Sequence, residues 1–384
     1  MESDKSTNKD IIIREVTNKG LLKKFADFPN ILYKDIPEYI PGFYQDDMDD
    51  WTPDKNPAFE YCEAKAFLAY KDGKIVGRIG AILNHRANDK WNTSCMRFSQ
   101  VDFIDDYDVS RSLFEAVEEW ARQKNCTQVH GPLGFCDLDR EGMLTEGFEH
   151  RSLFFTYYNH PYYIKHLTAL GYAKEADWVE YRIDVPTEDS DFYQRVHRIS
   201  QIAIKRHNLH VVNLRRRDDY KPYVKKVFQL INEAYAPLYG VVELNDKQVQ
   251  KYADKFIPLV NPEYCCFVVD EKDDLVAFGV SSPSMADALK KSRGRLLPFG
   301  WIRILRSLQK PEALDLLLMA VKPIYQKQGV NSILIDHVNT NCIKNGIKYV
   351  ETGPELEMNR KMRNQWKMLG VEPFKRRSSF IKNI

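Results

Sequence analysis

A glycine turn ahead of a helix is the segment of this sequence best suited to hold a phosphorylated group. The strongly apolar run Leu314–Val321 predicts a strand that is buried on both faces, and a helix is predicted over Ser332–Cys342. Gly329 lies in the turn between them, and Lys327 adds positive charge beside it. Because glycine lacks a Cβ and a helix N-terminus presents N–H groups, such a turn suits a pyrophosphate. A glycine turn that only begins a helix would look the same.

The elements that would position this turn are predicted twice along the chain. A hairpin over Ala66–Asn84 is followed by a strand, a helix and a strand that ends at Gly131-Pro132. A second hairpin over Tyr264–Ser281 begins the same order, which ends at Gly353-Pro354. A Leu-Gly pair then closes a late helix in each copy. The pattern predicts an internal duplication, and the alternative is that these pairs recur by chance.

The duplication predicts an α/β fold with two domains. We expect an N-terminal domain at residues 1–186, a helical connection at 187–208 and a C-terminal domain at 209–384. The connection carries a basic cluster that can face either phosphates or solvent.

The first copy carries acids where the second has its glycine turn. Asp105, Asp106 and Asp108 occupy this place, and their charges would repel a pyrophosphate. Asp108 is expected to cap the helix that follows. The sequence therefore predicts a cofactor in the second copy and a degenerate turn in the first.

The turn of the second copy carries a family resemblance. Gln326, Gly329 and Asn331 fall on a family turn that reads Gln or Arg, two residues, Gly, one residue, then Gly or Ala, after the fourth strand. The chain thus resembles the GNAT superfamily of acyl-CoA N-acyltransferases, although Asn331 replaces the small final residue. The segment His130–Phe148 also resembles an uncharacterised bacterial group of GNAT-like proteins. The resemblance implies two tandem GNAT-like domains, each a mixed central sheet flanked by helices.

The resemblance also implies a co-substrate, acetyl-CoA or another acyl-CoA, whose pantetheine lies along the fourth strand. Glu351 would act as general base on an amine, although an ion pair between strands is its other possible role. Asn359 would orient the thioester, since the late helix predicted over Arg360–Leu369 has no tyrosine to protonate the leaving thiolate. The residues implied to bind the cofactor are Met319, Ala320, Val321, Gln326, Lys327, Gln328, Gly329, Val330 and Asn331.

Acids and aromatic residues in the first copy favour an acceptor site there. The insertion Leu133–Phe155 alternates acids with apolar residues, and an aromatic cluster overlaps its end. Such a surface can receive a cationic amine, whereas the alternative is a core of aromatic side chains with solvated acids. The residues expected to bind the substrate are Asp137, Asp139, Glu141, Tyr157 and Tyr158.

The composition limits the partners. Lys and Arg total 56 against 54 Asp and Glu, a net charge of +2, so no nucleic-acid partner is expected. No apolar run has the length of a membrane span and the N-terminus is not a secretory signal, so no membrane association is expected. The 7 cysteines form no CxxC pair, which favours buried thiols, no metal and a cytoplasmic location. The expected partner is a small-molecule amine or a peptide, and the oligomeric state stays open.

Three functions are consistent with these features. The first is an N-acyltransferase that moves an acyl group, expected to be acetyl, from acyl-CoA to an amine. The second is a catalytically inactive GNAT-like binding or interaction protein, which Asn331 and the missing late-helix tyrosine favour. The third is an aminoacyl-tRNA-dependent Fem-type transferase, against which the near-neutral charge and the lack of a long helical hairpin argue.

Overall fold

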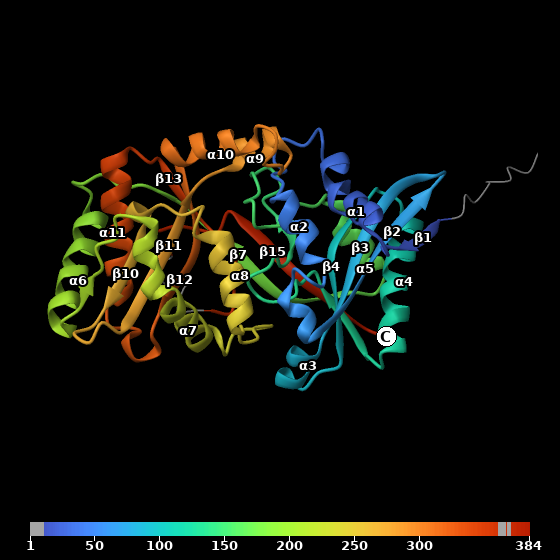
Figure 1. The fold of residues 1–384 in the computed structure, drawn as a ribbon, viewed down its shortest axis with the longest axis horizontal. Coiled ribbons are helices and arrows are strands. Elements are labelled where there is room, and N and C mark those ends of the chain that lie inside the picture. Colours follow the sequence, from blue (N-terminus) through green and yellow to red (C-terminus); the bar gives the residue numbers. More distant parts are fainter. Residues whose placement is uncertain (1–10, 360–365, 367–369) are drawn as a thin grey trace, which may run out of the picture. The chain divides into compact units, whose positions relative to one another are not determined.

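The computed structural model describes residues 11–359, 366 and 370–384, and the chain divides into two compact units (Figure 1). The first unit extends to Asp177 and includes Arg377–Ile384, whereas the second spans Trp178–Arg376. The chain therefore enters the second unit within strand β7 (Ala173–Glu180) and leaves it within β15 (Lys375–Asn383). This division differs from the expected one because the end of the chain returns to the first unit.

A mixed sheet forms the centre of the first unit, with strands in the order β1-β2-β3-β4-β5-β15-β7 and β6 paired to β15. β4 runs parallel to β5, whereas β2 and β4 run antiparallel to β3. The other elements of this unit are β1 (Ile12–Glu15), α1 (Lys19–Leu32), α2 (Tyr44–Asp50), a 3₁₀ turn (Pro57–Glu60), β2 (Cys62–Lys71), β3 (Lys74–Asn84), α3 (His85–Trp91), β4 (Cys95–Phe103), α4 (Tyr107–Gln123), β5 (Gln128–Gly131), β6 (Met143–Glu146) and α5 (Tyr162–Ala169).

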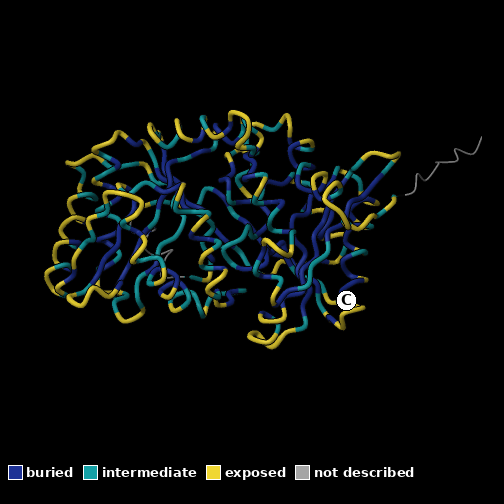
Figure 2. The backbone as a smooth tube through the Cα atoms, in the orientation of Figure 1, coloured by how far each residue is buried: buried dark blue, intermediate teal, exposed yellow. Residues whose placement is uncertain are grey.

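Alternation along β2 divides the core of the first unit between the two faces of the sheet. Phe67 and Ala69 belong to the apolar cluster that includes the buried face of α4, whereas Leu68 and Tyr70 belong to a cluster that includes residues of α1. Successive side chains of a strand point to opposite faces, so helices cover both sides of this sheet. Figure 2 shows the buried residues following the central strands.

Helix α4 is capped by Asp106. The prediction that Asp108 caps this helix is therefore wrong. The Asp106 carboxylate accepts from the N–H of Asp108 at 3.0 Å and pairs with Lys71 at 2.5 Å. Asp106 has the extended backbone conformation of an N-cap, with φ −144° and ψ 115°, whereas Asp108 already lies in the first turn. Asp108 instead pairs with Arg111 at 2.9 Å.

The second unit has a sheet in the order β8-β13-β12-β11-β10-β9. β12 runs parallel to β13 and antiparallel to β11, and β14 pairs with the part of β7 that lies in this unit. The elements are β8 (Arg182–Asp184), α6 (Asp191–His207), β9 (His210–Val211), a 3₁₀ turn (Arg217–Tyr223), α7 (Val224–Tyr235), α8 (Asp246–Phe256), a 3₁₀ turn (Pro262–Tyr264), β10 (Cys265–Val269), β11 (Leu275–Pro283), α9 (Ala286–Ser292), α10 (Gly300–Gln309), β12 (Ala313–Val321), a 3₁₀ turn (Pro323–Tyr325), α11 (Val330–Asn345), β13 (Tyr349–Thr352) and β14 (Glu355–Leu356).

The segment predicted as a connection is an integral part of the second unit. Helix α6 begins after Ser190, whose hydroxyl accepts from the N–H of Tyr193 at 3.2 Å. It packs along α11, and its Ala203 shares a buried cluster with Val330. The basic Lys205 at its end is exposed. The helix predicted over Arg360–Leu369 lies outside the described residues except for Trp366.

Both units repeat one arrangement of strands. A hairpin, β2-β3 or β10-β11, is followed by a strand that runs parallel to the next one, and a helix joins the parallel pair. The parallel pairing is short in each case, since it ends at Arg97↔His130 in the first unit and at Leu316↔Thr352 in the second. The repeated element order predicted from the sequence is therefore present in the structure.

Candidate active site

Strand β12 loses its parallel neighbour part-way along its length. Pairing with β13 begins at Ala313↔Tyr349 and ends at Leu316↔Thr352. The N–H of Gly353 still donates to the Leu316 carbonyl at 3.2 Å, and beyond this point the described residues of β12 pair only with β11. Among the described strands, the last residues of β12 are therefore paired on one side.

A β-bulge marks the point where the parallel strands part. Val280 pairs with Leu318 and Ser281 with Leu316, so Leu317 is the extra residue of β12. A bulge of this kind bends its strand and ends regular pairing. The bend falls immediately before the three residues of β12 predicted to hold a cofactor.

These three apolar residues form the end of β12. Ala320 is buried, whereas Met319 and Val321 are half-buried. The Met319 carbonyl accepts a hydrogen bond from the hydroxyl of Tyr235 on α7 at 2.8 Å. Backbone groups of this strand end therefore accept bonds from outside the sheet, as contact with an extended ligand would require.

The predicted anion-binding turn lies where β12 leads into α11. Gly329 is the N-cap of α11 with φ 81°, and Lys327 before it also has a positive φ of 63°. The side-chain amide of Gln326 donates to the carbonyl of Val321 at 3.1 Å and ties the turn to the end of β12. The first N–H groups of a helix have no acceptor within the helix, so they are oriented toward this turn. Of the remaining turn residues, Gln328 is exposed, Asn331 is half-buried and Val330 is buried.

Packing gives Gly329 a second reason to be glycine. A Cβ at this position would lie 3.0 Å from Cγ2 of Ile199 on α6. Its left-handed backbone conformation also favours glycine. The turn is therefore consistent both with an anion site and with a helix start that binds nothing.

Three charged residues form one row across β8, β13 and β12. Arg182 lies opposite Glu351, and Glu351 lies opposite Asp315. Glu351 is buried and accepts from Nε of Arg182 at 2.8 Å, so it forms the inter-strand ion pair that the sequence left open as its other role. Its role as a base stays a prediction.

Asp315 is the member of this row with the chemistry of a base. It is 2% exposed, and burial followed by the charge of Glu351 raises the pKa of Asp315 to about 7. A hydrogen bond from Ser284 partly offsets this rise. Sequence reasoning misses Asp315, although an acid inside the apolar run Leu314–Val321 is a signal, since burying a carboxylate is costly.

A second carboxyl with a raised pKa follows β13. Both carboxylate oxygens of Glu355 accept from Nε1 of Trp366, at 2.8 and 2.9 Å. Burial raises the pKa of Glu355 to about 8, against the lowering effect of this bond. Asn359 is half-buried, and its N–H donates to the Leu356 carbonyl at 2.9 Å. The predicted role of Asn359 toward a thioester stays a prediction.

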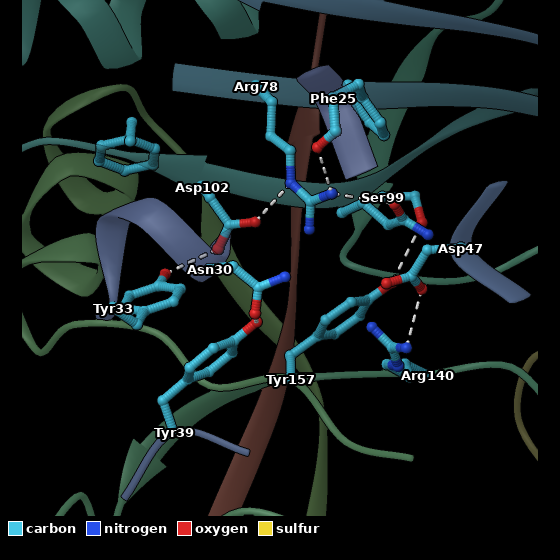
Figure 3. Close-up of polar contacts among 12 residues, drawn as sticks. Phe25, Asn30, Tyr33, Tyr39, Asp47, Arg78, Ser99, Asp102, Arg140 and Tyr157 are labelled. Carbon is cyan, nitrogen blue, oxygen red and sulfur yellow. Dashed lines mark hydrogen bonds and ion pairs between the residues drawn. The ribbon is translucent and has the colours of Figure 1, made fainter. Parts of the chain in front are cut away.

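The first unit encloses a group of buried polar side chains between β3, β4 and α1 (Figure 3). Nε of Arg78 lies 2.6 Å from the carboxylate of Asp102, and the Tyr33 hydroxyl donates to the same carboxylate at 2.7 Å. The hydroxyls of Tyr33 and Tyr163 lie 2.8 Å apart. Burial raises the pKa of both tyrosines well above the usual value, so both keep their protons. This group is a closed ion pair with its own hydrogen-bond partners.

Tyr157, one of the predicted substrate residues, borders this group (Figure 3). Its hydroxyl lies 3.4 Å from Oγ of Ser99, and the Arg140 guanidinium lies 5.8 Å from its ring centre. Arg140 in turn pairs with Asp47 at 2.8 Å. By contrast, Tyr158 packs edge-on against Tyr33 within an apolar cluster, as the core alternative requires.

The acids predicted to bind the substrate lie in the insertion after β5. Asp139 accepts from the N–H groups of Phe135 and Cys136 at 2.9 and 3.3 Å, so it stabilises the turn of its own loop. Burial, followed by the charge of Asp137, raises the pKa of Glu141 well above its usual range. The structure thus gives Asp139 a structural role and leaves Asp137 and Glu141 as predicted substrate contacts.

Metal-binding clusters and membrane-spanning helices are both absent from the described residues. No group of three His, Cys, Asp or Glu side chains among them is arranged to hold a metal ion. None of their helices is both long and apolar enough to cross a bilayer.

Comparison with solved structures identifies the architecture. A tandem GNAT protein from the clavulanic acid biosynthesis pathway matches 97% of this chain and 98% of its own, with a TM-score of 0.55 and 13% identity. The chain has a tandem GNAT fold. A GCN5-related N-acetyltransferase from Sphaerobacter thermophilus matches with a TM-score of 0.51 and 11% identity, over 97% of this chain and 95% of that one. No family model matches the sequence.

Two curated proteins are similar in sequence. Protein YghO of Escherichia coli (strain K12) is 26% identical over 379 residues, which cover 97% of this chain and 95% of that protein. A bacterial ceramide synthase of Caulobacter vibrioides (strain NA1000 / CB15N) is 27% identical over 328 residues, 84% of this chain and 83% of that protein.

The two halves of the tandem GNAT fold differ at the strand edge beyond the parallel pairing. In the first half, the N–H of Phe103 donates to the hydroxyl of Tyr163 at 2.7 Å, and its carbonyl accepts from Tyr162 at 2.6 Å. In the second half, the side chains of Tyr235 and Gln326 donate to the carbonyls of Met319 and Val321, and both come from outside the sheet. The first edge is closed by the unit's own tyrosines, so the second is the better candidate for a ligand.

The raised pKa of Asp315 predicts an unusual dependence of stability on pH. Its folded-state pKa of about 7 lies above the ordinary value of 3.8, so the native state holds the proton more tightly and loses stability as pH rises between these values. We expect Asp315→Asn to gain stability relative to the natural protein on going from pH 5 to pH 8, by about 3 kcal/mol, since only about two pH units of this window lie below the folded-state pKa. Urea unfolding at both pH values measures this difference. The exposed Asp274→Asn is the matched control, and a parallel pH response of Asp315→Asn and the natural protein would contradict the assignment.

Proposed function

We propose that the second unit transfers an acyl group from an acyl-CoA to an amine. The observation that carries this proposal is that β12 and the turn after it hold three features in sequence. These are Asp315, the edge beyond Leu316 and the turn at Gly329. The GNAT fold supports an N-acyltransferase at a coarse level, while donor and acceptor are parts of the proposal.

The donor would lie along the β12 edge with its pyrophosphate at the turn. Gly329 and Val330 begin α11, whose N-terminal N–H groups and dipole favour an anion. Lys327 is exposed beside the turn and adds a positive charge. The Met319 carbonyl would accept from an amide of the pantetheine arm, alongside or in place of Tyr235.

Asp315 would accept the proton that the amine loses as its nitrogen bonds to the thioester carbon. A pKa of about 7 leaves about half of this carboxyl ionised at neutral pH and makes the ionised form basic enough to take a proton. Glu351 would assist Asp315, because the charge of Glu351 raises the pKa of Asp315. As the carbon–sulfur bond breaks, the leaving thiolate takes a proton, for which we propose the Tyr235 hydroxyl at the β12 edge.

The relative named as a ceramide synthase suggests a class of acceptor. Ceramide is an amide of a fatty acid with a long-chain amino alcohol, so that name describes N-acylation of a lipid amine. We therefore propose a long-chain amino alcohol as the acceptor and a long-chain acyl-CoA as the donor, with acetyl-CoA and a small amine or peptide as the second candidates.

The donor site predicts a charge-dependent effect at Gly329. Gly329→Asp should weaken acetyl-CoA binding at least about tenfold, which corresponds to about 1.4 kcal/mol. Gly329→Asn is the matched control, because Asn has the same shape without the charge and tolerates a positive φ. Titration calorimetry with acetyl-CoA measures both variants. Equal losses in the two variants would assign the effect to shape, and no binding by the natural protein would refute the proposal.

The base assignment predicts distinct pH–rate profiles. The rate should rise with pH through an inflection near pH 7, where Asp315 loses its proton. Asp315→Asn should lower kcat by about 10²-fold. Glu351→Gln removes the charge that raises the pKa of Asp315, so its inflection should move to lower pH. The exposed Glu312→Gln is the control, and loss of activity at every pH in Glu351→Gln alone would make Glu351 the base.

The acceptor class is tested with a matrix of donors and acceptors. We expect palmitoyl-CoA with a long-chain 2-amino alcohol to react faster than acetyl-CoA with spermidine or a lysine peptide. Product formation is followed by mass spectrometry and release of the free thiol. Preference for the polar amines would overturn the lipid assignment, and coenzyme A binding without turnover across the matrix would support an inactive binding protein.

A further inference from the structure

The connection between β11 and β12 is an amphipathic, basic surface element. It contains α9 and α10, which pack on each other, and α10 also contacts β11 (Figure 1). Ile304 of α10 is buried and anchors the helix, and Arg303 donates to the Lys291 carbonyl at 3.1 Å. The element is therefore held to the unit on one side and has a free outer face.

The outer face carries large apolar side chains in contact with solvent. Leu297 is 78% exposed, Phe299 65% and Trp301 48%. Leu305, one helical turn after Trp301, is 45% exposed, so the apolar stripe continues along α10. The indole N–H of Trp301 donates to the Pro298 carbonyl at 3.1 Å, which fixes the loop before the helix. Exposed apolar side chains concentrated in one short element mark an interaction surface.

Positive charge accompanies these side chains. Residues 288–311 include seven basic residues, and the acids of the connection, Asp287 and Glu312, lie only at its two ends, so the net charge of +2 conceals a local excess of positive charge. The basic residues are Lys290, Lys291, Arg293, Arg295, Arg303, Arg306 and Lys310. A helix with Trp, Phe and Leu on one face and Lys and Arg around them is typical of a protein that lies on an anionic membrane surface.

We infer that this basic apolar element, residues 288–311, docks the protein on the surface of an anionic lipid bilayer. Leu297, Phe299 and Trp301 enter the interface between head groups and acyl chains, and the basic side chains contact anionic head groups. A second copy of the chain fits less well, because a two-fold interface would bring like charges together. The phosphate backbone of a nucleic acid offers no partner for the exposed apolar side chains.

This surface begins beside the proposed base. Ser284, at the start of the connection, forms a hydrogen bond with Asp315, and its N–H donates to the Ala313 carbonyl at 2.9 Å. An amine that resides in a bilayer would thus reach the protein near this carboxyl. That link rests on the proposed function, whereas docking itself does not. Docking also departs from the expectation of no membrane association, since that expectation considered spans and total charge only.

The test is cosedimentation of the full chain with vesicles in the absence of substrates. We expect binding to phosphatidylcholine vesicles that contain phosphatidylglycerol, weaker binding to phosphatidylcholine alone, and loss of binding at high salt. The double variants Leu297→Asp/Phe299→Asp and Arg303→Glu/Arg306→Glu should each lower the partition coefficient at least about tenfold. The natural protein's tryptophan emission should shift to the blue on binding, and Trp301→Phe should remove most of that shift.

Matched controls change the same kinds of residue on α6 of the same unit. Ile202 is 56% exposed, and Lys205 and Arg206 are exposed, so Ile202→Asp and Lys205→Glu/Arg206→Glu should leave the partition within about twofold. Thermal unfolding checks that all variants are folded. The inference is overturned by no binding to anionic vesicles at low salt, or by equal losses in the controls. A dimer or an RNA complex lost in Leu297→Asp/Phe299→Asp, without vesicle binding, would also overturn it. Because no turnover is measured, failure of docking and failure of the acyltransferase proposal are separate results.

Discussion

The end of pairing between β12 and β13 at Leu316 is the constraint on which the second unit depends. A strand that continues without a neighbour leaves backbone N–H and C=O groups that need partners from a side chain, water or a ligand. The residues of β12 are too apolar to be fully solvated, and Gln326 and Tyr235 satisfy two of its carbonyls. These two side chains partly shield the strand edge at which we propose that an extended ligand binds.

Some buried carboxylates of the second unit form ion pairs with a cation, whereas Asp315 has no cation within ion-pair distance among the described residues. Lys375 and Glu180 form a pair in which both side chains are 0% exposed, and Arg182 pairs with Glu351. Asp315 lies beside Glu351 in the same row, and the charge of Lys375 lowers its pKa only weakly. Burial, followed by the charge of Glu351, therefore makes Asp315 a weaker acid than an exposed carboxyl. The chemistry assigned to Asp315 therefore follows from the register of three strands.

The sequence was sufficient for the features that depend on local pattern. The repeated order of elements, the apolar run of β12 and the Gly329 turn are each determined by a few adjacent residues. The sequence was insufficient for features that depend on pairing between residues far apart in the chain. Asp315 and Arg182 are far apart in the chain and meet only through β13, and Tyr158 and Asp139 acquire structural roles from partners that no spacing indicates.

The two units share one architecture but differ in what occupies the strand edge beyond the parallel pairing. In the first, tyrosines from α5 bond to the edge of β4 and Asp106 caps α4, so the protein's own side chains occupy the place that corresponds to the proposed cofactor site. Its β3–β4 connection holds only the short helix α3. In the second, Tyr235 and Gln326 donate to two carbonyls at the edge of β12, and the base candidate Asp315 lies on the same strand. The β11–β12 connection of this unit contains α9 and α10, which form the basic apolar element. Binding features accumulate in the unit whose edge stays accessible, because only there can a ligand contribute the missing hydrogen bonds.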